Sequence, residues 1–173
     1  MKTEKSQDGT SQNKEYNVFR DSLLRFMGYA NEVGESFRYQ FPKLVAPTYV
    51  LAFGYCAADS LNAGYTKWNE DDSKRKINNQ SLVSKEYEIA YAVGDTLLWQ
   101  CFASVLIPGG IINVIVRASR FAIARPALGG LPSGIKKWSP TAVGLGSIPF
   151  IVHPIDTFVD MVMDETTRKW FKK

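Results

Sequence analysis

The chain has 173 residues, a net charge of +4 and 45% hydrophobic residues, a length and composition that suit one domain with a substantial core. Its lysines and arginines are interleaved with acidic residues over much of the sequence, which argues against a nucleic-acid-binding protein. The two cysteines, Cys56 and Cys101, lie in apolar segments and indicate neither a disulfide framework nor a zinc site.

The chain begins with a polar tail over residues 1–15 that mixes acidic and basic residues. The tail has no apolar core and resembles neither a signal peptide nor an arginine-rich transit peptide, so any organelle targeting is expected to be internal. An amphipathic helix is predicted over residues 16–41, lying against a surface and ending near Pro42, with Glu35 and Arg38 on its outer face. Its apolar positions are three or four residues apart: Tyr16, Phe19, Leu23, Phe26, Ala30, Val33 and Phe37.

Three apolar runs follow, each close to the roughly 20 residues that a membrane-spanning helix needs. They cover residues 44–61, 89–107 and 141–163. A polar loop over residues 62–88 separates the first two, and Pro108 with the two glycines after it is expected to break the second. Core helices of a soluble protein are the competing explanation. No internal repeat and no strand alternation occurs, so we predict an all-α integral membrane protein with about three transmembrane helices in a single domain over residues 16–173.

A basic interfacial segment is predicted over residues 111–138, which contain no acidic residue. Its basic residues are Arg117, Arg120, Arg125, Lys136 and Lys137. The three arginines fall within an arc of about 140° on a helical wheel. This pattern resembles an interfacial helix whose arginines meet anionic head groups, so membrane lipids, and cardiolipin in particular, are expected as ligands. An ordinary basic loop is the alternative.

The apolar runs contain a few polar side chains that are expected to pack against protein, because their exposure to lipid would be unfavourable by several kcal/mol. These candidates for intramembrane polar packing are Asp59, Asp95, Gln100, His153, Asp156 and Asp160. Gln100 also forms, with Thr96 and Ser104, a stripe that suits helix–helix packing in lipid. Three helices offer few interior positions, so some of these residues are expected to contact partner proteins in the membrane.

His153 is the only histidine and lies between Pro149 and Pro154, and three interpretations compete for it. An enzyme would need a nucleophile, paired carboxylates or a metal-ligand set beside it. No such motif occurs, so no catalytic residue, metal site or cofactor is predicted. A proton or ion path would use a stripe of ionisable residues: His153, Asp156, Asp160 and Asp164, with Asp95 opposite.

The structural interpretation of His153 is preferred. Pro149 and Pro154 are expected to kink or break the helix between residues 148 and 154, and His153 would then satisfy backbone groups freed at that point. A kinked helix would still cross the membrane, whereas a complete break would leave residues 141–153 half-embedded. The sequence leaves both arrangements open.

Several stretches resemble the mitochondrial fission process protein 1 family, also called the mitochondrial 18 kDa protein family. They are "RDSLLRFMGYANEVGESFR" (20–38), "DTLLWQ" (95–100), "ASVLIPG" (103–109) and "IPFIVHPID" (148–156). The resemblance implies a non-enzymatic, multi-pass protein of the mitochondrial inner membrane that is linked to fission and inner-membrane morphology. An accessory subunit of a respiratory-chain complex or supercomplex is the alternative, and a component of a proton or ion path is a third. The distribution of lysine and arginine favours the N-terminus on the matrix side.

Overall fold

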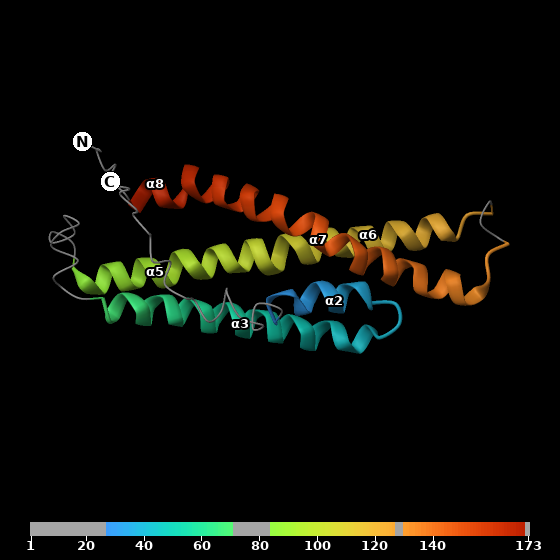
Figure 1. Cartoon of the computed structure of the whole chain (residues 1–173), viewed down its shortest axis with the longest axis horizontal. Coiled ribbons are helices and arrows are strands. Elements are labelled where there is room, and N and C mark those ends of the chain that lie inside the picture. Colours follow the sequence, from blue (N-terminus) through green and yellow to red (C-terminus); the bar gives the residue numbers. More distant parts are fainter. Residues whose placement is uncertain (1–26, 71–83, 127–129, 172–173) are drawn as a thin grey trace, which may run out of the picture.

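The computed structural model describes residues 27–70, 84–126 and 130–171, and all of the regular secondary structure in these ranges is helical. The predicted all-α fold class is therefore confirmed. The long helices lie side by side along the long axis of the molecule (Figure 1). In chain order the elements are α2 (Ala30–Ser36), α3 (Pro42–Trp68), α5 (Lys85–Gln100), the π-helix η3 (Cys101–Leu106), α6 (Ile107–Ile123), α7 (Ser133–Glu165) and α8 (Thr167–Phe171).

Three helices are long and apolar enough to cross a membrane, as predicted: Pro42–Trp68, Lys85–Ile123 and Ser133–Lys169. Large apolar side chains cover their outer surfaces, and Phe150 and Val50 are 79% and 73% exposed. A soluble bundle would bury such side chains, whereas lipid solvates them. The exposed surface therefore favours membrane-spanning helices over soluble core helices.

The expected break at Pro108 is wrong, because α5, η3 and α6 form one continuous helix of 39 residues. Pro108 has no N–H, so it cannot donate the hydrogen bond that the carbonyl of Ser104 would accept in an α-helix. Just before it the backbone widens into η3, where the N–H of Ile107 donates to the carbonyl of Phe102, five residues earlier. The predicted basic segment is consequently divided between the end of this helix and the start of α7.

The third apolar run is also continuous, so a complete break between residues 148 and 154 is excluded. Helix α7 extends from Ser133 to Glu165 with Pro140, Pro149 and Pro154 inside it. Each proline removes one backbone donor, but ending the helix in apolar surroundings would leave several backbone groups unpaired. Continuing the helix is the less unfavourable solution. A role of His153 at a complete helix break is therefore excluded, and its role at a kink stays a prediction.

Helix α2 is a short element enclosed by the long ones, and it packs against α3, α6 and α7 (Figure 1, blue). It follows a 3₁₀ turn over residues 27–29 and ends at Ser36, so the predicted end near Pro42 is wrong: residues 37–40 form a turn, and Pro42 is the first residue of α3. Its buried side is polar, while Val33 of the predicted apolar seam is 40% exposed. The part of that seam over residues 16–26, like the tail over residues 1–15, lies outside the described residues.

Two glycines allow α2 to approach its neighbours closely. A Cβ added at Gly34 would lie 1.9 Å from Oγ1 of Thr48 on α3. A Cβ added at Gly144 of α7 would lie 2.8 Å from Oγ of Ser36 on α2. Both distances are below van der Waals contact, so only glycine fits at these positions without displacing the partner helix.

We predict that Gly34→Ala destabilises the protein by about 1–3 kcal/mol, because the added methyl group overpacks the contact between α2 and α3. Gly54→Ala is the matched control, since a Cβ at Gly54 meets no atom within 4 Å. That substitution should raise helix stability by up to about 1 kcal/mol. Thermal unfolding of the detergent-solubilised protein measures both effects, and equal stability of the two variants would contradict the close contact.

Candidate functional site

Polar side chains gather at four places in the described structure. Two are adjacent clusters on α2, a third is a buried chain between α3 and η3, and a fourth is an ion-pair cluster near the C-terminus. Separately, cations lie over aromatic rings near the end of α6 and the start of α7. These two helix ends lie at the same end of the bundle (Figure 1). No group of three or more metal-ligating residues occurs in residues 27–70, 84–126 and 130–171.

Glu35 is the centre of the first cluster and is 1% exposed. Arg38 binds both of its oxygens through Nε and Nη2 at 2.6 Å, and Nδ2 of Asn113 donates to Oε2 at 2.8 Å. The hydroxyl of Tyr49 donates to Oε1 at 3.1 Å. Burial alone would raise the pKa of Glu35, but these hydrogen bonds and the charge of Arg38 hold it below its ordinary value. The expectation that Glu35 and Arg38 decorate an outer face is therefore wrong: Glu35 joins α2 to α3 and α6.

Asn31 and Glu32 form the second cluster, and both are 0% exposed. Nδ2 of Asn31 donates to the carbonyl of Val105 at 3.0 Å, so α2 satisfies a backbone group of the π-helix. Neither carboxyl oxygen of Glu32 has a hydrogen-bond partner among the described residues. Burial raises the pKa of Glu32 from 4.5 to about 8. Two glutamates one helical turn apart therefore favour opposite protonation states.

A hydrogen-bonded chain joins α3 to the last residue of α5 and to η3. Oγ of Ser104 donates to Oε1 of Gln100 at 2.6 Å, and Nε2 of Gln100 donates to Oδ2 of Asp59 at 2.5 Å. Asp59 is 1% exposed and Gln100 is 3% exposed, so both side chains face protein within this chain. The third member of the predicted stripe, Thr96, is half-buried.

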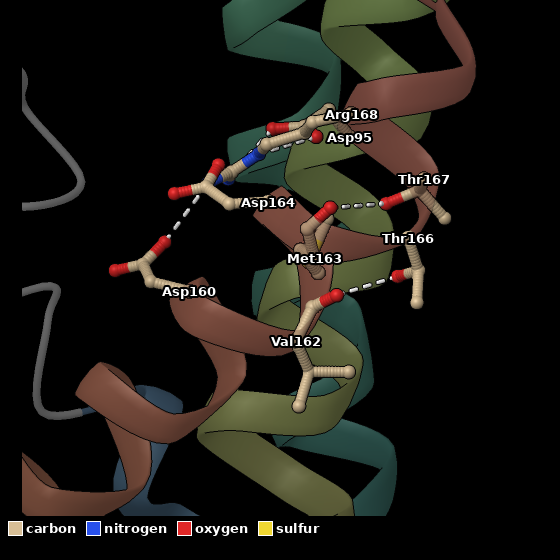
Figure 2. Close-up of polar contacts among 8 residues, drawn as sticks. All are labelled: Asp95, Asp160, Val162, Met163, Asp164, Thr166, Thr167 and Arg168. Atoms are coloured by element: carbon tan, nitrogen blue, oxygen red, sulfur yellow. Dashed lines mark hydrogen bonds and ion pairs between the residues drawn. The ribbon is translucent and has the colours of Figure 1, made fainter.

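Arg168 organises the ion-pair cluster between α5 and the C-terminal part of the chain (Figure 2). Its guanidinium binds both oxygens of Asp95 at 2.9 Å. Nη1 also lies 3.1 Å from carboxylate oxygens of Asp160 and Asp164. The neighbouring hydroxyls of Thr166 and Thr167 donate to the carbonyls of Val162 and Met163 on the preceding turn. Arg168 was not predicted as a site residue, although its i, i+4 spacing from Asp164 was a usable signal.

The four residues of the predicted ionisable stripe lie on the continuous helix α7, but their surroundings differ. The side chain of His153 is exposed, and its backbone carbonyl accepts a hydrogen bond from Thr157. Asp156 is half-buried, and Asp160 points to Arg168. Within the predicted stripe, only Asp160 and Asp164 share Arg168 with Asp95, whereas His153 is exposed and Asp156 is half-buried.

The predicted lipid-binding residues lie together at the end of the bundle formed by α6, α7 and the turn before α3, which we call the basic end. They are Arg117, Arg120, Arg125, Lys136 and Lys137. Several of them lie over aromatic rings: Arg120 is 4.1 Å from the ring centre of Tyr39, and Arg125 is 4.8 Å from that of Phe121. Lys137 is 5.8 Å from the ring centre of Trp138. Cations interleaved with exposed aromatic rings are typical of helix ends at a membrane–water interface.

We predict that Arg168→Gln destabilises the protein by about 1–3 kcal/mol, because three carboxylates then face one another without a cation. Lys169→Gln is the control, since its pair with Glu165 is largely exposed and contributes at most about 0.5 kcal/mol. Thermal unfolding in detergent at neutral pH gives both values. Equal midpoints for the two variants would show that Arg168 does not hold α5 to the C-terminal helices.

Comparisons with known proteins give consistent matches over nearly the whole chain. A family model described as Mitochondrial 18 KDa protein matches residues 16–163. Proteins called mitochondrial fission process protein 1 are similar: that of Caenorhabditis elegans is 45% identical over 157 residues, covering 90% of this chain and 89% of the relative. The human protein is 38% identical, covering 91% and 89%, and the Danio rerio protein is 38% identical, covering 92% of both chains. No solved structure matches the chain.

Proposed function

The chain belongs to the mitochondrial 18 kDa protein family, and we propose that it is a non-enzymatic, multi-pass protein of the mitochondrial inner membrane that acts in mitochondrial fission. The observation that carries the proposal is the match over about nine tenths of this chain to relatives named for the fission process, together with three helices of membrane-spanning length. The three long apolar helices support residence in a membrane, and the name of the relatives supports a role in mitochondrial fission.

The polar clusters support a structural role for the buried charges. Asp95, Asp59 and Glu35 each bind a side chain from a different part of the chain, and these contacts lie at successive levels along the bundle. They fix how the long helices are aligned with one another. The charges that remain at the surface of the basic end are the ones available to a ligand.

We propose that the basic end faces the matrix and contacts anionic phospholipid, cardiolipin above all. The sequence has no acidic residue between Asp95 and Asp156. No carboxylate of this stretch therefore competes with a lipid phosphate for the cations of the basic end. At the opposite end Lys67 and Lys169 pair with Glu70 and Glu165. The excess of positive charge at one end favours its retention on the matrix side. Guanidinium groups bind phosphate through paired hydrogen bonds.

The fission role is tested by rescue in human cells depleted of the 38%-identical human relative. Loss of a fission protein should lengthen mitochondria, and expression of this chain should restore their length. Carbonate extraction should leave the chain in the membrane pellet, and protease should reach it only after the outer membrane is opened. A chain that is inserted correctly but fails to shorten mitochondria would contradict the fission role. Migration in one fixed large complex on native gels would instead support an accessory subunit.

The lipid proposal predicts that joint replacement of Arg117, Arg120 and Arg125 by glutamine weakens cardiolipin binding by about 1 kcal/mol per residue. The measurement is the rise in the thermal unfolding midpoint when cardiolipin is added to the protein in neutral detergent. A charge-matched control replaces Lys67, Lys85 and Lys169 at the opposite end and should keep the full rise. Equal rises in both triple variants, or an equal rise with phosphatidylcholine, would exclude the basic end as the binding site.

A further inference from the structure

Two glutamates of α2 share complete burial but not their surroundings. Glu35 accepts hydrogen bonds from Arg38, Asn113 and Tyr49. Both carboxyl oxygens of Glu32 are buried, and neither has a partner among the described residues. A buried carboxylate without a partner is far less stable than the same carboxylate in water, whereas a neutral carboxyl loses much less on burial. Among the described residues, Glu32 therefore has the surroundings of a protonated carboxyl group and not those of a carboxylate.

The nearest titratable side chains on α2 and α3 do not supply a compensating positive charge. Tyr49 and Cys56 of α3 interact electrostatically with Glu32, but a phenol and a thiol carry no positive charge in either protonation state. Asp59, farther along α3, accepts a hydrogen bond from Gln100. Arg38, the cation nearest in sequence, already binds both oxygens of Glu35.

The other helices around α2 do not supply that charge either. The titratable residues of α6 are Arg117 and Arg120, which are exposed near its C-terminal end. Helix α7 has no titratable side chain between Lys137 and His153, and His153 is exposed. In η3 the one titratable group is Cys101, which is half-buried. An ionised Glu32 would gain hydration only if α2 left its place.

We infer that Glu32 is a proton-binding site, and that its bound proton keeps α2 docked between α3, α6 and α7. Release of the proton breaks one O–H bond, transfers the proton to water and leaves a carboxylate. The carboxylate favours the undocked position, where water can reach it. The remaining contacts of α2, including the Asn31 bond to η3 and the close approach of Gly34 to Thr48, are retained only while α2 stays docked.

The direction of the pH dependence follows from the two pKa values of Glu32. The pKa is about 8 when the carboxyl is buried, against an ordinary value of 4.5. Between these values the docked form binds one proton more than the undocked form. The contribution of Glu32 to docking is therefore largest below pH 4.5, and it weakens by about tenfold per pH unit as the pH rises from 4.5 toward 8. The pKa of Glu35 is lowered, so Glu35 stays ionised in this range and adds nothing to the change.

The first experiment measures hydrogen exchange of the α2 amides in the full chain, reconstituted in phosphatidylcholine nanodiscs, from pH 5 to pH 8. Glu32→Gln is permanently neutral and has nearly the same shape, so its comparison with wild type at each pH removes the intrinsic pH dependence of exchange. The ratio of wild-type to variant exchange rates should rise by about tenfold per pH unit. Glu86→Gln, at an exposed site in the first turn of α5, should leave exchange in α2 unchanged. A ratio between wild type and Glu32→Gln that stays constant over this range would overturn the proposal.

The second experiment needs no variant and uses dicyclohexylcarbodiimide, an apolar reagent that adds a protonated carboxyl across its C=N bond. Mass spectrometry should find the adduct on Glu32 and not on Glu35, and the yield on Glu32 should fall as the pH rises through about 8. An unlabelled Glu32, or equal labelling of both glutamates, would show that Glu32 is not the protonated site. This outcome would leave the role in fission untouched, because the rescue assay measures that role independently.

Discussion

The requirement that every backbone polar group in apolar surroundings find a partner explains most of this fold. Pro108, Pro149 and Pro154 would end a helix in water, where solvent accepts the freed carbonyls. Here the helices continue through all three. At Pro108 the adjustment takes the form of a π-helix, and one of its carbonyls, that of Val105, is satisfied from another helix by Asn31. Backbone pairing thus links the continuity of the long helices to the position of α2.

Apolar surroundings also change the usual distribution of side chains. The outer surface holds large apolar groups such as Phe150, while the fully buried residues include Glu32, Glu35 and Asp59. Burial of apolar surface drives little association between helices in lipid, so close contacts and hydrogen bonds must hold them together. Glycines allow the close contacts of α2, and the polar clusters provide the hydrogen bonds. The alignment of the helices then depends on a few polar side chains and on the glycines at the close contacts.

The sequence predicted what depends on composition and missed what depends on three-dimensional neighbours. Three long apolar runs separated by charged residues were sufficient for the fold class and for the three candidate spans. Proline-based breaks failed because helix-breaking rules describe chains that water can solvate. The i, i+3 spacing of Glu35 and Arg38 is typical of an ordinary surface pair, and it is the same whether the helix is exposed or buried. Arg168 was overlooked because its main partner, Asp95, is 73 residues away in sequence. The basic end was identifiable, since a long acid-free stretch is a property of the sequence itself.

The π-helix has a geometrical consequence for the angular phase of the helix that contains it. One extra residue per turn offsets the residues that follow by about 100° relative to an uninterrupted α-helix. Gln100 lies before this offset and faces Asp59, whereas Gly109 and Asn113 lie after it and face α2 and its Glu35. A single helix can therefore present one face to α3 in its first half and a rotated face to α2 in its second. Removing one residue from the π-helix would convert it to an α-helical turn and keep both faces toward their partners. Removing one residue from the α-helical turns on either side would instead rotate one face away from its partner.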